Sequence, residues 1–98
     1  MTGNYPEEAS AEVAEIYFRG AKGLAQRPVE DIFELLGKPR DYDDWDLGRL
    51  VYNWHSAERC VRIYTSHDRV DAVHLMEPVN TPRFGAALEV IWTRPDGQ

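Results

Sequence analysis

The apolar residues of this chain change their spacing near residue 48, from a helical repeat to a two-residue repeat. Between residues 10 and 36 they recur every three or four positions, as in amphipathic helices. From residue 49 onward, short stretches rich in β-branched and aromatic residues alternate with turn residues. The sequence therefore predicts an α+β fold, with two N-terminal helices packed on one face of an antiparallel sheet of three to four strands.

Two short helices are predicted before this change. Ser10 is a suitable N-cap for the first helix. Its expected apolar face consists of Val13, Ile16, Tyr17, Gly20, Ala21 and Leu24. The second helix begins with Pro28, which suits the first helical position, and it ends at Gly37 and Pro39. Its apolar stripe consists of Val29, Ile32, Phe33 and Leu36. Neither helix can bury its stripe against the other alone, so both require a sheet.

Four stretches are predicted as strands: 49–55, 59–65, 70–76 and 87–93. The short connections between the first three favour hairpins and therefore an antiparallel meander, whereas the place of the last strand stays open. Alternation assigns the following residues to the core face: Leu50, Tyr52, Trp54, Val61, Ile63, Leu88, Val90 and Trp92. The third strand adds either Val70, Ala72 and Met76 or Val73 and Leu75 to this face. The opposite face carries Val51, Cys60, Tyr64 and Ile91. That second apolar surface is open to a partner, a twin subunit or a ligand, unless the loop at 77–86 or the C-terminal segment covers it.

Size and composition indicate one globular domain, residues 1–98, with an ordered core at about 10–94. The chain is 43% hydrophobic and 29% charged, which excludes an extensively disordered protein. Its single cysteine, Cys60, rules out an internal disulfide. The residues after Met1 lack the basic and apolar regions of a secretory signal, so we expect a cytoplasmic protein; a leader removed earlier stays open.

The net charge of −6 lies entirely in the first half of the chain, since residues 1–48 carry eleven acidic and five basic residues. Such a field disfavours phosphate backbones and anionic lipid, so neither nucleic acid nor membrane is an expected partner. It favours a basic protein partner. The alternative is that the acidic residues only keep a small protein soluble.

The most distinctive local feature is Asp41-Tyr42-Asp43-Asp44-Trp45-Asp46, in which four carboxylates are interspersed with two large aromatics. A calcium loop is not indicated, because Trp45 stands at the fifth position, Asp46 at the sixth where glycine is needed, and Tyr52 at the twelfth where glutamate is needed. We interpret the segment as an acidic loop whose partner-binding residues are Tyr42, Asp43, Asp44 and Trp45. The alternative is a solvated loop whose aromatics fold onto the core.

A second candidate site is the apolar sheet face near Cys60, Tyr64 and His74. Cys60 with a histidine is formally a nucleophile and base, although a lone strand cysteine is more often a small buried hydrophobe. The sequence has no glycine-rich phosphate loop, no nucleophile elbow and no zinc-type spacing of histidine and cysteine. We therefore expect no enzyme activity, no cofactor and no metal.

The phrase Val29-x-x-Ile32-Phe33-x-x-Leu36-Gly37-x-Pro39, followed by an acidic loop and Leu50-Val51-Tyr52-x-Trp54, resembles the SmpA/BamE and β-lactamase-inhibitor-protein-like domains. The likeness covers roughly residues 10–76, and it implies a two-helix, antiparallel-sheet fold used for binding proteins. We expect no role in outer-membrane assembly, because the residues after Met1 show no lipoprotein leader or lipidation cysteine and Cys60 falls within a predicted strand. The family's functional residues are therefore not transferred.

The sequence thus favours a non-enzymatic protein-interaction domain, for instance an inhibitor or immunity-type protein, that binds a basic partner through its acidic, aromatic loop. The alternative is a small-ligand-binding domain or marginal enzyme that uses the apolar sheet face. A third interpretation is a homodimer formed through that same face.

Overall fold

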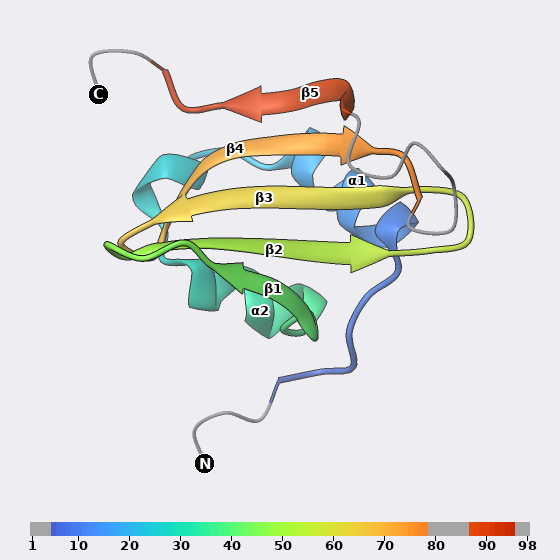
Figure 1. Ribbon diagram of the computed structural model, residues 1–98, viewed down its shortest axis with the longest axis horizontal. Helices are drawn as coiled ribbons and strands as arrows, with labels where there is room; N and C mark the ends of the chain where they lie inside the picture. Colours follow the sequence, from blue (N-terminus) through green and yellow to red (C-terminus); the bar gives the residue numbers. More distant parts are fainter. Residues whose placement is uncertain (1–4, 79–86, 96–98) are drawn as a thin grey trace.

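The computed structural model describes residues 5–78 and 87–95, which form two α-helices, a short 3-10 helix and five strands (Figure 1). The helical elements are α1 (Ala11–Gly20), η1 (Leu24–Gln26) and α2 (Val29–Leu36). The strands are β1 (Asp41–Asp44), β2 (Arg49–His55), β3 (Cys60–Ser66), β4 (Arg69–Met76) and β5 (Ala87–Thr93). The expectation of a covering loop at 77–86 and of disorder at the two ends concerns residues largely outside these described ranges.

The strands form one sheet in the order β1-β2-β3-β4-β5, and each neighbouring pair is antiparallel. Both α-helices lie against one face of this sheet, behind it in Figure 1. The predicted α+β class is therefore confirmed, with five strands in place of three to four. The additional strand is β1, and β5 lies beside β4 at the opposite edge, which settles the position that the sequence left open.

Helix α2 agrees closely with its prediction. All four residues of its apolar stripe are buried, and Phe33 contacts Tyr52 with ring centroids 4.9 Å apart. The proline is the N-cap residue, one position earlier than expected. Gly37 ends the helix with φ 77° and ψ 152°, a conformation that essentially only glycine adopts. The residues that start and stop the helix agree with the spacing of its apolar residues. Together they were sufficient to predict both its ends and its buried face.

The buried face of α1 differs in part from the prediction. Tyr17, Ala21 and Leu24 pack in or against the core as predicted, the last from the separate helix η1, whereas Val13 and Ile16 are 51% and 74% exposed. The fully buried residues of α1 are Ala11, Ala14 and Phe18. This stripe also follows helical spacing, and its largest member packs against the buried Trp54 with ring centroids 5.7 Å apart. The two alanines let the helix approach the sheet closely, so the core selects this stripe over the bulkier one.

The helix-facing side of the sheet supplies the remaining core, and its residues on β2 and β3 are as predicted. Buried on this side are Tyr52, Trp54, Val61, Ile63, Val70 and Val73. The two valines of β4 come from both of the alternative sets, because the pairing of β3 with β4 shifts register between Tyr64 and Thr65. Strand β5 departs from prediction in part: Trp92 packs against the core as predicted, but so does Ile91, and Leu88 and Val90 are each 52% exposed. The pairing of β4 with β5 shifts register twice, between Val73 and His74 and again before Met76. These β-bulges break the strict alternation on which the prediction depended.

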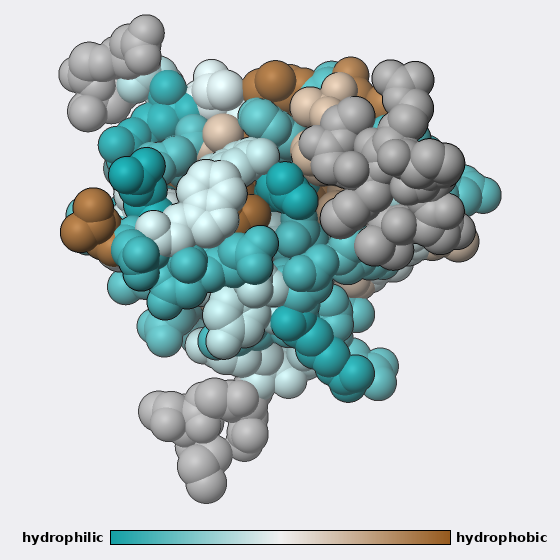
Figure 2. All heavy atoms as spheres, viewed as in Figure 1, coloured by the Kyte–Doolittle hydropathy of each residue, from teal (hydrophilic) through white to brown (hydrophobic). Residues whose placement is uncertain are grey.

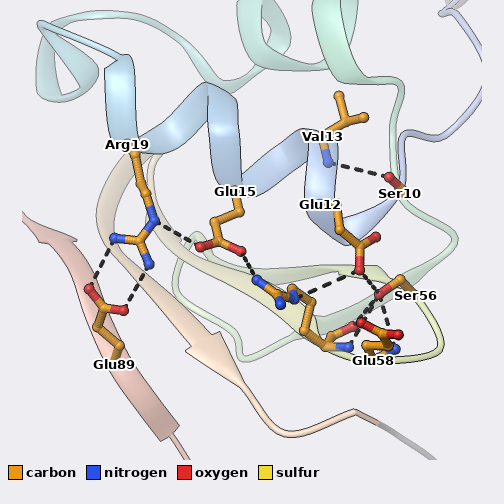
Figure 3. A network of polar contacts seen from close by, with 9 residues as sticks. Ser10, Glu12, Val13, Glu15, Arg19, Ser56, Glu58 and Glu89 are labelled. Atoms are coloured by element: carbon orange, nitrogen blue, oxygen red, sulfur yellow. Dashed lines mark hydrogen bonds and ion pairs between the residues drawn. The ribbon is translucent and has the colours of Figure 1, made fainter.

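A chain of charged contacts joins α1 to strand β5 and to the β2–β3 hairpin (Figure 3). Arg19 donates two hydrogen bonds to Glu89 of β5, at 3.0 and 2.8 Å, and one to Glu15 at 2.8 Å. Glu15 also accepts from Arg59 of the β2–β3 hairpin. These hydrogen bonds lower the pKa values of Glu15 and Glu89, Arg59 being the main cause for the first and Arg19 for the second. The network fixes α1 across the sheet and attaches the outermost strand to it.

Candidate functional site

The acidic segment is an edge strand rather than the loop that we predicted. Asp41 pairs with Asn53, and the ladder continues to Asp44 opposite Leu50. Aspartate is a poor strand former, but all four residues of β1 are exposed, so their carboxylates remain solvated while the backbone pairs on one side only. Charged side chains on a short edge strand discourage pairing with unrelated strands. The segment thus combines negative charge with a regular, accessible sheet edge.

A tight turn after β1 fixes the direction in which Trp45 leaves the strand. The Asp44 carboxylate accepts a hydrogen bond from the backbone N–H of Asp46 at 3.0 Å, and the Trp45 N–H donates to the Arg49 carbonyl at 2.8 Å. Gly48 has φ 77°, and a Cβ there would lie 2.7 Å from Nδ1 of His67. The turn therefore rests directly on the β3–β4 hairpin, which keeps the end of β1 in place.

The two aromatics of the predicted site lie on opposite sides of the sheet. Tyr42 stacks on Tyr52 with centroids 5.7 Å apart, on the helix-facing side, and Lys38 lies 5.3 Å from its ring centre. Trp45 makes an edge contact with Tyr64, on the helix-free side, at 5.9 Å. Both rings remain half exposed, at 48% for the tyrosine and 51% for the tryptophan. The predicted residues therefore wrap around the β1 edge and do not form a patch on one face.

The carboxylates of β1 are not arranged as a cation site. The Asp41 carboxylate pairs with the imidazole of His55, and the Asp44 carboxylate accepts the backbone hydrogen bond from Asp46 that closes the turn. Within residues 5–78 and 87–95, no group of three histidine, cysteine, aspartate or glutamate side chains could hold a metal ion. The chemistry available at this edge is thus charge attraction, aromatic contact and backbone hydrogen bonding.

The second candidate site lies on the helix-free face, where Cys60 is fully buried. Its thiol donates to Oδ1 of Asn53 at 3.7 Å, and the same oxygen accepts from Nε of Arg62 at 2.8 Å. Burial raises the pKa of Cys60 to about 11, which disfavours the nucleophilic thiolate. The sequence interpretation missed the role of Asn53, although its place between Tyr52 and Trp54 in an alternating strand puts it opposite the core.

Tyr64 and His74 do come together on this face, with ring centroids 4.9 Å apart. Burial lowers the pKa of His74, and the nearby Arg62 lowers it further, so both effects favour the neutral imidazole. Where grey atoms do not cover it, this face is largely hydrophilic in Figure 2. Val51 and Cys60, which the sequence assigned to this face, are both buried, so they do not contribute an exposed apolar surface.

Two hollows occur elsewhere on the described parts of the molecule. One, of about 140 Å³, lies between η1 and the end of β5, and its lining includes Leu24 and Trp92. The other is an open depression between residues 5–8 and the polar side chains of Lys38 and Arg40. Neither of these two hollows is lined by any of the three residues of the second candidate site.

No protein-family model matches this chain, and comparison with curated proteins and with solved structures gives no match either. Among the described helices, none is both long and apolar enough to cross a membrane.

Proposed function

We propose that this protein is a non-enzymatic interaction domain that binds a basic protein partner through the β1 edge. The residues in contact are Tyr42, Asp43, Asp44 and Trp45. An inhibitor or immunity-type role is the form of this function that the sequence resemblance suggests. The fold serves as a rigid support, and the recognition chemistry lies on one strand and its turn.

The observation that carries the proposal is the placement of these residues on an exposed sheet edge. Such an edge offers backbone donors and acceptors to an added strand, which is a recurrent way of binding extended segments. The carboxylates supply long-range attraction to lysine and arginine and oppose pairing with neutral or acidic strands. The two half-exposed rings supply contact area on either side of the edge, as aromatics do in protein interfaces.

The alternative function, a ligand site or marginal enzyme at Cys60, Tyr64 and His74, has the ring contact between Tyr64 and His74 in its favour. The buried thiol and its raised pKa weigh against covalent catalysis there. Binding through the β1 edge therefore remains the better supported proposal.

The test is capture of partners from a lysate of the source cells, with the wild-type domain compared with a variant carrying Asp43→Asn, Asp44→Asn and Trp45→Ala. We expect the wild-type domain to retain a basic protein that is released as salt rises, because screening weakens contacts between exposed charges. The variant should lose the same protein, as identified by mass spectrometry.

A matched control removes two carboxylates elsewhere, with Glu30→Gln and Glu34→Gln on α2. This control changes the net charge equally and should keep the partner. Retention of the same partner by the β1 variant would overturn the proposal, as would loss of the partner by both variants, which would indicate a net-charge effect.

A further inference from the structure

Strand β5 forms the second edge of the sheet, and its chemistry is opposite to that of β1. Leu88 and Val90 are each about half exposed, and Figure 2 shows hydrophobic residues gathered along the edge where Figure 1 draws β5. Its only charged residue is Glu89, which the two hydrogen bonds from Arg19 compensate. An exposed apolar edge strand with little net charge is suited to pairing with another chain.

A hollow of about 140 Å³ lies beside the C-terminal end of the same strand. It is lined by Gly23, Leu24, Ala25, Gln26, Trp92 and Pro95. The lining combines polar atoms with the apolar side chains of Leu24, Trp92 and Pro95, so the hollow can receive part of an apolar side chain. The strand thus has an exposed apolar side chain, Leu88, near one end and a partly apolar recess near the other.

We propose that β5 is a self-association surface on which a second copy of this chain binds, with the two β5 strands antiparallel about a two-fold axis at Val90. In a contact about a two-fold axis, both copies use the same surface, so that surface must be complementary to itself. An axis at Val90 places Leu88 of each copy opposite Trp92 of the other, beside the hollow. The exposed side chain and the recess of one strand are then mutually complementary.

Charge is also compatible with this pairing. The same axis places Glu89 opposite Ile91, so no like charges face each other. Antiparallel pairing of β1 with a second β1 would instead bring Asp41 opposite Asp44. Self-association is therefore favoured at β5 and opposed at β1.

The two β-bulges of β5 limit what else this edge can bind. A bulge interrupts the regular ladder and increases the twist of its strand. Continuous strand addition by unrelated segments is disfavoured as a result, and the contact depends mainly on side chains. The β1 edges stay exposed at the outer ends of this dimer, which separates this inference from the proposed function.

The experiment is measurement of molecular mass by light scattering and sedimentation over a range of protein concentrations. We expect twice the chain mass for the wild-type protein at high concentration, and a single chain mass for Leu88→Lys. Leu47→Lys is the control, because Leu47 is 80% exposed at the β1–β2 turn, and this variant should remain dimeric. A wild-type protein that is monomeric throughout, or a dimer unaffected by Leu88→Lys, would overturn the proposal.

Crosslinking provides a second test that does not depend on the folding of a charged variant. The two-fold axis brings both copies of Val90 face to face, within the range that a disulfide spans after modest adjustment. Val90→Cys should therefore form a disulfide-linked dimer on mild oxidation, whereas Leu47→Cys should not. The native Cys60 is fully buried and does not compete. Equal crosslinking of both variants would contradict an axis at Val90.

Discussion

The two edge strands of the sheet, β1 and β5, both expose backbone groups that could pair with other chains, and they limit such pairing in different ways. Each leaves one side of its backbone without a neighbouring strand in the described structure, which invites indiscriminate pairing. Strand β1 is short and carries three aspartates, so charge and solvation oppose pairing. Strand β5 is longer and largely apolar, and two bulges interrupt its ladder. Charge therefore selects the partners of one edge, and shape selects those of the other.

The edges also differ in how they are attached to the core. Strand β1 follows α2 through Gly37 and is closed by the turn that rests on His67. Strand β5 is joined to α1 by the exposed contact between Arg19 and Glu89. One attachment depends on backbone conformation and the other on an ion pair, so they should respond differently to mutation, salt and pH.

The largest effect is expected from Gly37→Ala, at the start of the β1 attachment. A Cβ there would lie 2.6 Å from the backbone oxygens of Pro6 and Glu7, and the backbone conformation is one that alanine avoids. We expect a loss of about 3 kcal/mol in the free energy of unfolding, measured by urea denaturation.

Gly20→Ala is the matched control for this substitution. No atom lies within 4 Å of a Cβ at Gly20, so this variant should be at least as stable as the wild-type protein. A Gly37→Ala protein of wild-type stability would show that this backbone conformation does not hold β1 in place.

The second prediction tests whether charge protects the β1 edge. Replacing Asp43 and Asp44 by valine removes two carboxylates and raises strand propensity, so β1 should become a template for pairing. We expect concentration-dependent assembly beyond the wild-type size, measured by light scattering. Glu30→Val with Glu34→Val on α2 removes equal charge and should not assemble in this way. If both double variants behave alike, net charge rather than the edge controls solubility.

The sequence predicted the parts of the fold whose local signals agree. In helix α2, the apolar stripe and the glycine that ends the helix are consistent with one helix and one buried face. Strands β2 to β4 are stretches rich in β-branched and aromatic residues, joined by short turns. The face of α1 was mispredicted at Val13 and Ile16 because two stripes both follow helical spacing, and only packing against the sheet selects between them. Strand β1 was missed because its aspartates disfavour strands, and it exists through pairing with β2.

The candidate site was predictable in identity but not in arrangement. Tyr42 and Trp45 were singled out from composition, yet their placement on opposite sides of the sheet depends on the strand register and on the turn at Gly48. The exposure of Leu88 and Val90 could not be derived either, since the bulges that expose them arise from the pairing of β4 with β5. Non-local register was the missing information in each case.

The third prediction concerns acid, which should weaken the α1 network that includes β5. Glu12, Glu15 and Glu89 all have pKa values below the ordinary 4.5, through hydrogen bonds from Ser56, Arg59 and Arg19 respectively. A lowered folded-state pKa stabilises the protein above pH 4.5, and this contribution is lost as the pH falls through the folded-state value. The urea midpoint should therefore decline below about pH 4.5, and less steeply in Glu15→Gln. An unchanged slope in that variant would exclude this carboxylate as a cause.

The smallest effect is expected from Glu89→Gln, which weakens the ion pair between α1 and β5. Both side chains are substantially exposed, so the loss of overall stability should be slight and should shrink further at high salt. Local opening is the more sensitive measurement, because an edge strand can detach without global unfolding. Amide hydrogen exchange should therefore quicken in β5 and stay unchanged in β1, whereas Gly37→Ala should affect β1 first. Faster exchange in both edges of Glu89→Gln would show that the two strands open together, and the contrast between their attachments would then fail.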